Sequence, residues 1–216
     1  MIKKIKRKIW SILIKLKIGG IIQMFLSSGI RDDGWFESFN TKKSIDKYGT
    51  PIPWCTYSFI KFIEPRLKRD FLVFEYGSGN STFWYAKRVG FVKCVEHDLK
   101  WYNENINQYS ANVQAVYRPF NNDLTYASEI SKDNIKYHII IIDGVDRNNC
   151  VKFSIQKLTE NGVIVYDNTQ LPDYRISMEF LLENGYKRID FEGLLPIVSY
   201  NNITSIFYKD NNCLGI

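Results

Sequence analysis

Acidic and amide side chains follow two apolar segments of this 216-residue sequence, at the points where each segment ends. Asp143 ends one segment, and Asp167 with Asn168 ends the next. Two carboxylates and an amide are suitable ligands for a hard divalent cation such as Mg²⁺. Without a metal, Asp143 becomes the candidate general base, and Arg147 becomes the candidate for steadying an oxyanion or an anionic group of the acceptor. The simpler alternative is that all of these are strand-end turn residues.

A glycine-containing loop, E-Y-G-S-G-N-S-T, occupies positions 75–82. Gly77 and Gly79 allow a tight turn and close approach of a ligand to the backbone, and Ser81 or its neighbour can cap a following helix. Thr82 stands where the dinucleotide-binding fingerprint has its third glycine. Glu75 precedes the first glycine by two positions, and a carboxylate there suits an ammonium group better than a pyrophosphate.

Glu96 lies 21 residues beyond Glu75, at the end of another apolar segment. A carboxylate at that spacing and position can accept hydrogen bonds from both hydroxyls of a ribose. His97 follows it directly and is either a neighbour of the bound ligand or a solvated side chain. Together these residues predict a ligand with an ammonium group and a ribose.

Short apolar strands alternate with helical stretches from residue 71 onward, which predicts an α/β fold with a doubly wound, mostly parallel sheet and helices on both faces. Ligands of such sheets bind beyond the carboxyl ends of the strands. The expected strands are 71–75, 91–96, 113–117, 138–143, 162–167, 187–191 and 204–208, and the expected helices are 81–88, 99–109, 149–158 and 173–184.

The formal charge of +6 is concentrated at one end of the chain. Residues 1–20 hold seven of the 29 basic side chains and no acidic one, so the rest holds 22 basic and 23 acidic side chains. A body so close to neutral argues against a nucleic-acid-binding face.

Within residues 1–20, isoleucines and leucines recur at steps of three and four, which predicts a basic amphipathic helix ending at Gly19-Gly20. One possibility is that the helix lies in an anionic membrane interface. The other is that it packs its apolar stripe on the domain or on a second subunit, and packing on a second subunit would make a homo-oligomer. Lys15 and Lys17 interrupt the apolar stretch, so the segment does not resemble a signal peptide.

Residues 21–67 are expected to be a connector or substrate-side cap, irregular from about 27 to 53 and helical from 56 to 67, ahead of a ligand-binding domain at 68–216. Trp35 and Trp54 within it either cover a ligand or fill the edge of the core. The four scattered cysteines predict reduced thiols rather than a disulfide or zinc framework, and the apolar runs fall far short of the roughly 20 residues that cross a bilayer.

Four segments resemble class I S-adenosylmethionine-dependent methyltransferases: E-Y-G-S-G-N-S-T, V-E-H-D, I-I-I-I-D-G and V-I-V-Y-D-N, within residues 71–209. The resemblance implies a seven-stranded Rossmann-like sheet whose last strand is antiparallel. It also implies that Glu96 and His97 flank the adenosine of the cofactor and that Asp123 reaches its adenine amine. Glu75 and the loop of Gly77, Ser78 and Gly79 would hold the cofactor's methionine part, and Tyr76 and Ser81 would also bind the cofactor.

The glycine loop, I-D-G-V-D-R-N-N-C and T-S-I-F-Y also resemble small bacterial methyltransferases associated with cell-surface polysaccharide synthesis. Asp143, Asp167 and Asn168 are similar to the metal ligands of catechol and caffeoyl-CoA O-methyltransferases, although Asp146 stands near the point where the catechol enzymes carry a catalytic lysine.

Three functions remain open at this point. The first is a cytoplasmic S-adenosylmethionine-dependent O-methyltransferase, metal-assisted or not, acting on a hydroxyl of a sugar or polysaccharide precursor, with residues 1–20 at the inner face of the membrane. The second is an NAD-binding oxidoreductase, and the third is a non-catalytic membrane-surface adaptor on a methyltransferase scaffold.

Overall fold

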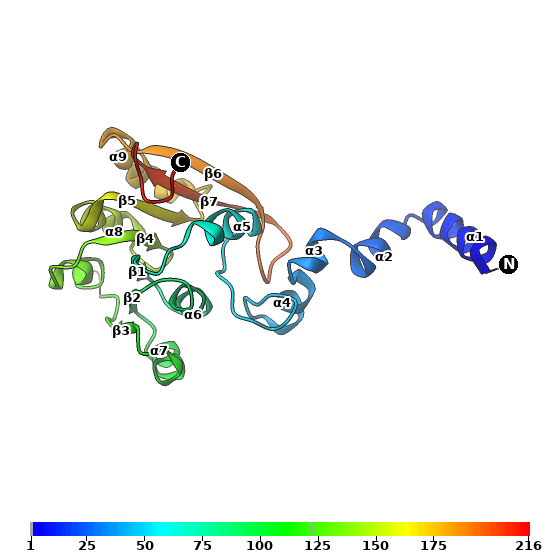
Figure 1. Ribbon diagram of the computed structural model, residues 1–216, viewed down its shortest axis with the longest axis horizontal. Coiled ribbons are helices and arrows are strands. Elements are labelled where there is room, and N and C mark those ends of the chain that lie inside the picture. The colour runs from blue at the N-terminus through cyan, green and yellow to red at the C-terminus, as the bar shows by residue number, and fades with distance from the viewer. Residues whose placement is uncertain (1, 122) are drawn as a thin grey trace.

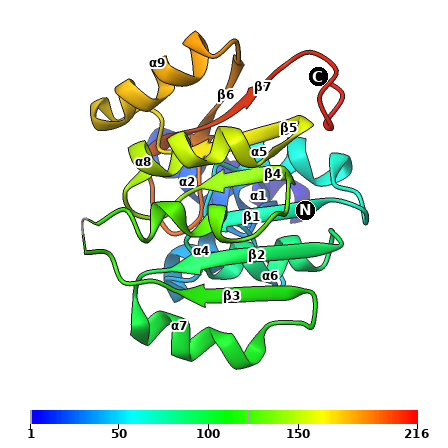
Figure 2. The same ribbon diagram turned by 90° about the vertical axis from the view of Figure 1, so that its left-hand side faces the viewer.

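The computed structural model describes residues 2–121 and 123–216, and it contains one seven-stranded sheet (Figures 1 and 2). The strand order is β3-β2-β1-β4-β5-β7-β6, and β7 is antiparallel to both of its neighbours. The predicted doubly wound α/β fold with an antiparallel last strand is therefore confirmed. The strands are β1 Leu72–Tyr76, β2 Phe91–Glu96, β3 Val113–Tyr117, β4 Tyr137–Ile142, β5 Leu158–Asp167, β6 Lys187–Leu194 and β7 Asn201–Tyr208.

Helices cover both faces of the sheet. The α-helices are α1 Ile2–Lys15, α2 Gly19–Leu26, α3 Gly29–Asp32, α4 Trp35–Thr41, α5 Tyr57–Ile63, α6 Asn80–Ala86, α7 Leu99–Asn105, α8 Arg147–Ser154 and α9 Arg175–Glu183. The short 3₁₀ turns are η1 Glu64–Arg66, η2 Ile106–Gln108, η3 Ala127–Lys132, η4 Ile155–Lys157 and η5 Pro172–Tyr174.

Alternate residues of the central strands face two separate hydrophobic cores, because successive side chains of a strand point to opposite faces. Val73 of β1 packs in the core that contains Trp84 of α6 and Phe59 of α5. Phe74 and Tyr76 point the other way, into the core with α8 and α9. Burial on both faces explains the nearly continuous apolar runs of these strands.

The predicted element bounds are wrong around β5. The expected helix 149–158 begins earlier, at Arg147, and β5 begins at Leu158 rather than at 162. Leu158 pairs with Tyr137 before a register shift between β4 and β5. β5 can therefore begin at Leu158, because the polar residues between Leu158 and Gly162 form a bulge within the strand.

The N-terminal part of the chain differs from the prediction in two ways. Gly19-Gly20 does not end a single helix: α1 ends at Lys15, Lys17 takes a left-handed conformation with φ 58°, and Gly19 begins α2. The stretch predicted to be irregular contains α3 and α4. The Ser28 hydroxyl caps α3. Gly34, with φ 87°, directly precedes α4 and lies so close to Asp46 that a Cβ on Gly34 would be 2.3 Å from the carbonyl carbon of Asp46.

Among the described residues, no single helix combines the length and apolarity needed to span a membrane. The segments Ile5–Lys15 and Gly19–Asp32 reach that length and composition only as a pair, bent by 118° at the break between them.

Candidate functional site

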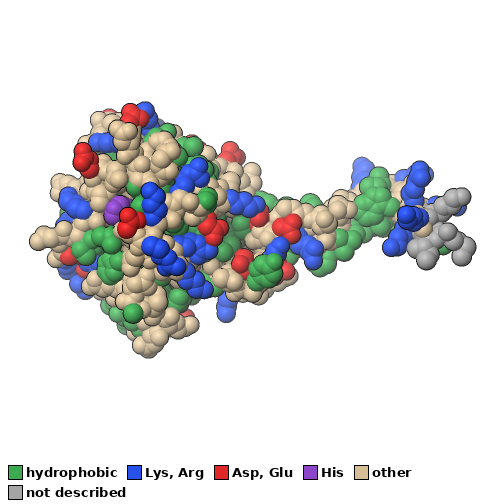
Figure 3. Space-filling view, in the orientation of Figure 1, with side chains coloured by type: hydrophobic (Ala, Val, Ile, Leu, Met, Phe, Trp, Pro, Cys, Tyr) green, Lys and Arg blue, Asp and Glu red, His purple; other side chains and the backbone are tan. Residues whose placement is uncertain are grey.

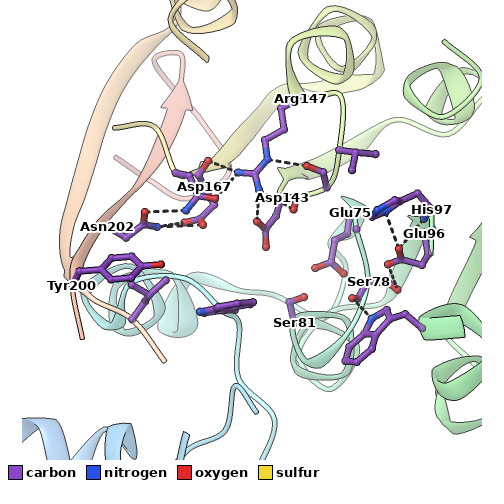
Figure 4. Close-up of a pocket in the computed structure, with 17 residues that line it drawn as sticks. Glu75, Ser78, Ser81, Glu96, His97, Asp143, Arg147, Asp167, Tyr200 and Asn202 are labelled. Carbon is purple, nitrogen blue, oxygen red and sulfur yellow. Dashed lines mark hydrogen bonds and ion pairs between the residues drawn. The ribbon is translucent and has the colours of Figure 1, made fainter. Parts of the chain in front are cut away.

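A cavity of about 630 Å³ opens at the carboxyl ends of β1, β2, β4 and β5 (Figure 4). This is the sheet edge at which parallel strands present the residues that follow them, and the strand order reverses here between β1 and β4. Ten residues predicted from the sequence to be part of the site line the cavity: Glu75, Gly77, Ser78, Ser81, Glu96, His97, Asp143, Arg147, Asp167 and Asn168.

The glycine loop after β1 makes the turn that its sequence predicts. Gly77 and Gly79 have φ angles of 97° and 149°, which side chains with a Cβ rarely adopt. Trp101 of α7 packs against this loop: its indole N–H donates to the Ser78 carbonyl at 2.8 Å, and a Cβ on Gly79 would lie 3.2 Å from its ring. Trp101 is not among the site residues predicted from the sequence. It lies in the first turn of a helix, and nothing in the sequence around it indicates contact with a ligand-binding loop.

Glu75 is a buried carboxylic acid on the floor of the cavity, with 1% of its surface exposed. The Thr82 hydroxyl donates a hydrogen bond to it at 2.5 Å. Burial raises the pKa of Glu75 to about 8, because the loss of hydration destabilises the carboxylate more than the hydrogen bonds from nearby hydroxyl groups stabilise it. The group therefore carries its proton at neutral pH until a cation approaches it.

Glu96 is held rigidly at the end of β2. The backbone N–H groups of His97 and Asp98 donate to its Oε1 at 2.7 and 2.8 Å, and the Ser78 hydroxyl donates to Oε2 at 2.9 Å. The His97 ring stands beside the same carboxylate, with Nδ1 3.0 Å from Oε1, and is 40% exposed. These contacts fix a carboxylate edge toward the cavity with lone pairs left for further donors.

Arg147, the first residue of α8, lies among the three oxygen donors that were predicted to bind metal. Its guanidinium donates to Asp143 Oδ1 at 3.1 Å and to Asn168 Oδ1 at 2.9 Å, and to the backbone carbonyls of Asp143, Gly144 and Asp167. Asn168 reaches it from a left-handed conformation, with φ 60°. The Arg147 guanidinium thus already bonds to the side chains of two of the three residues predicted to bind metal.

The Asp167 carboxylate points away from that position and toward β7. The Thr204 hydroxyl donates to its Oδ1 at 2.5 Å, and the Asn202 amide donates at 3.1 and 3.3 Å. The residues that the structure describes contain no group of three His, Cys, Asp or Glu side chains that could hold a metal ion. In this structure Asp143 and Asn168 accept hydrogen bonds from Arg147, and Asp167 accepts them from Thr204 and Asn202.

Arg147 also differs from its predicted role. Its side chain is 11% exposed, and its N–H groups donate to acceptors of the protein itself. Arg147 therefore orients Asp143 in this structure and does not present free donors to an anion. Burial raises the pKa of Asp143, and the charge and hydrogen bonds of Arg147 oppose that rise. Burial, followed by the charge of Asp143, raises the pKa of Asp167 to about 7.

Asn202 and Thr204 are site residues that sequence analysis missed. Both are buried, and both reach the site because the antiparallel pairing of β5 with β7 places Thr204 opposite Asp167. The sequence offers part of the signal for Thr204, because the expected strand 204–208 begins at this residue. Placing Thr204 in the site also needs the strand register that sets it opposite Asp167.

Several predicted residues lie elsewhere. The Tyr76 side chain is buried in the α8–α9 core, where its hydroxyl donates to the Ala127 carbonyl, so it does not line the cavity. Asp123 is exposed outside the cavity and accepts hydrogen bonds from Thr125. Of the two connector tryptophans, Trp35 donates its N–H to the Val198 carbonyl at 2.6 Å and fills the domain edge, whereas Trp54 lines the cavity.

Comparison with known proteins supports the fold. No family model and no curated protein matches the chain. Solved structures do match: a precorrin-6y C5,15-methyltransferase from Geobacter metallireducens (17% identity, 71% of this chain and 87% of that one, TM-score 0.57) and a putative O-methyltransferase from Klebsiella pneumoniae (16%, 88% and 94%, TM-score 0.54). A putative methyltransferase from Streptococcus mutans, solved in complex with SAH, matches at 10% identity over 68% of this chain and 94% of that one, with a TM-score of 0.50. The chain is thus similar in fold to Rossmann-like methyltransferases.

Proposed function

We propose that the protein is an S-adenosylmethionine-dependent O-methyltransferase that methylates a hydroxyl of a sugar or polysaccharide precursor. The observation that carries the proposal is the acidic cavity at the strand ends of a methyltransferase fold. Among the described residues that line it are four carboxylic acids, Glu75, Glu96, Asp143 and Asp167, against Arg147 and a half-exposed His97. Such a cavity favours a sulfonium with an ammonium group over a pyrophosphate, because its carboxylic acids can ionise beside a cation.

The residues present fit this cofactor. Glu75 lies where the ammonium of the methionine part would pair with it, beside the backbone of the Gly77–Gly79 turn. Glu96 offers its fixed carboxylate edge to the two ribose hydroxyls, and His97 and Trp101 border the same end of the cavity. NAD⁺ would share the ribose contact, but its pyrophosphate would meet Glu75.

Methyl transfer needs a deprotonated acceptor oxygen in line with the donor carbon. When bound, the cofactor would supply an electrophilic methyl group on sulfur, with a neutral thioether as the leaving group. Asp143 takes the proton of the acceptor hydroxyl as the new C–O bond forms, since its carboxylate lines the cavity with 28% of the side chain exposed. Arg147 holds that carboxylate in place through Oδ1, leaving Oδ2 to accept the proton.

A second cavity of about 880 Å³ adjoins the first and shares Trp54, Ser78, Ser81, Trp101 and Asp143 with it. We assign this space to the acceptor because it leads from the surface to the proposed base. Trp54 is 47% exposed at the shared wall, and Tyr200 is 64% exposed at the rim of the first cavity. Exposed aromatic rings beside a polar site provide stacking faces for a sugar ring. The association with surface polysaccharide rests on the sequence resemblance.

Calorimetric titration with S-adenosylhomocysteine, with NAD⁺ in parallel, tests the proposal. We expect S-adenosylhomocysteine to bind with a micromolar dissociation constant and NAD⁺ to bind at least about 100-fold more weakly, because of the acidic cavity. Binding of NAD⁺ alone would replace the proposal with the oxidoreductase, and binding of neither would favour the scaffold function.

Cofactor binding should also release a proton at pH 7. Free Glu75, with its pKa raised to about 8, is mostly protonated at that pH, and an adjacent ammonium favours the ionised form. The same titration in phosphate and in Tris, which differ in ionisation enthalpy, should therefore give different observed heats at pH 7 and converging heats well above pH 8. Equal heats in both buffers at pH 7 would remove Glu75 from the ammonium site.

A further inference from the structure

We propose that the N-terminal arm, defined as α1 and α2 with the turn between them, docks the protein on the surface of an anionic lipid bilayer. Figure 1 shows the arm extending away from the body, and Figure 3 shows apolar and basic side chains along it. Contacts run in sequence from α1 to α2 and from α2 to α3. Large apolar side chains more than half exposed on the arm include Ile5, Ile9, Ile12, Leu16, Ile21 and Phe25.

Three apolar side chains of α1, with Leu16 directly after the helix, lie in a stripe on one side, whereas Ile14, 55% exposed, lies on the other. Ile5, Ile9, Ile12 and Leu16 recur at intervals of three and four residues and are between 51% and 61% exposed. Exposure of a continuous stripe on a protruding helix marks an interaction surface rather than scattered surface residues. Trp10 beside the stripe is 36% exposed and has the amphipathic ring that favours a membrane interface.

Charge identifies the partner. The arm holds seven basic side chains, and the first acidic residue of the chain is Asp32, beyond the end of α2. A second copy of the chain would bring the same seven basic side chains. The remainder of each copy, with 22 basic and 23 acidic side chains, has a surplus of only one negative charge to meet them. An anionic lipid surface meets the charge and the apolar stripe together, each basic side chain strengthening binding about fivefold near such a surface.

The two helices suit the interface in length and composition. α1 has 14 residues and α2 has eight, so they extend about 21 and 12 Å. α2, with the sequence GGIIQMFL, contains no charged residue, and its Ile21 is 66% exposed. We infer that α1 lies flat with its basic side chains among the headgroups, while α2 sinks its apolar side chains into the acyl boundary.

The test is co-sedimentation of the full chain with phosphatidylcholine vesicles and with vesicles in which about one lipid in three is phosphatidylglycerol. We expect binding to the anionic vesicles that weakens with added salt, and at least about tenfold weaker binding to the neutral ones. Lys8→Glu on the arm changes the charge by two units and should lower the partition coefficient about 25-fold, whereas Lys100→Glu, at an exposed lysine of the body, should leave it within about twofold.

Apolar variants separate insertion from charge alone. Ile21→Asp should reduce sedimentation with anionic vesicles at least about tenfold, whereas Ile176→Asp, at 67% exposure on α9, is the matched control and should not. Equal sedimentation of wild type and Ile21→Asp, or equal binding to both vesicle types, would overturn the proposal. A lipid-free dimer in sedimentation velocity that Ile21→Asp dissociates would assign the arm to a second copy instead.

Discussion

Asp143→Asn is expected to reduce methyl transfer by at least about 100-fold while leaving the affinity for S-adenosylhomocysteine within about threefold. Asparagine keeps the shape of the side chain and an oxygen for Arg147 Nη2, which lies 3.1 Å from Asp143 Oδ1. It cannot take the proton of an acceptor hydroxyl. The loss should therefore appear in the transfer step, as a lower kcat, and not in cofactor binding.

The measurement is transfer of a radiolabelled methyl group to an acceptor found by screening sugars and nucleotide sugars with the wild type. Asp210→Asn is the matched control, because Asp210 is exposed and pairs only with Lys187 at the surface. Wild-type turnover in Asp143→Asn would show that Asp143 is not the base. Added Mg²⁺ should not change the wild-type rate, since Arg147 holds Asp143 and Asn168.

The sequence predicts the position of the site better than its internal contacts. Asp143 and Asp167 are brought to one cavity because parallel strands end at the same edge of a sheet, so their approach follows from the strand pattern alone. Which side chains they bond to depends on the register and helix starts that no local pattern fixes. The start of α8 at Arg147 places a guanidinium against Asp143 and Asn168, and the pairing of β5 with β7 turns Asp167 toward Thr204.

Burial also separates residues that look equivalent in the sequence. Tyr76 lies between two predicted cofactor ligands, yet the alternation of β1 turns its ring into the opposite core. Trp35 and Trp54 both lie in a polar connector, yet one fills the domain edge and the other lines the cavity. Residues 1–20 are predicted as one helix because the apolar spacing continues to Leu16, whereas α1 ends at Lys15 and Lys17 takes a left-handed backbone conformation.

Glu96→Ala should weaken S-adenosylhomocysteine binding about 100-fold or more. Two hydrogen bonds from ribose hydroxyls to a fixed carboxylate are lost together, each worth about 1.5–3 kcal/mol when one partner is charged. The substitution also frees the N–H groups of His97 and Asp98 and the Ser78 hydroxyl, which now converge on that carboxylate. The end of β2 and the glycine loop should therefore lose their mutual alignment as well.

Calorimetry with Glu96→Ala, Glu96→Gln and the control Glu183→Ala separates these effects. Glutamine keeps one acceptor oxygen without the charge, so its affinity should fall between those of the wild type and Glu96→Ala. Glu183 is an exposed residue at the end of α9, and its loss should leave binding unchanged. Thermal unfolding checks that each variant is folded. Wild-type affinity in a folded Glu96→Ala variant would rule out the ribose contact and with it the assignment of this cavity to the cofactor, whatever the behaviour of Asp143.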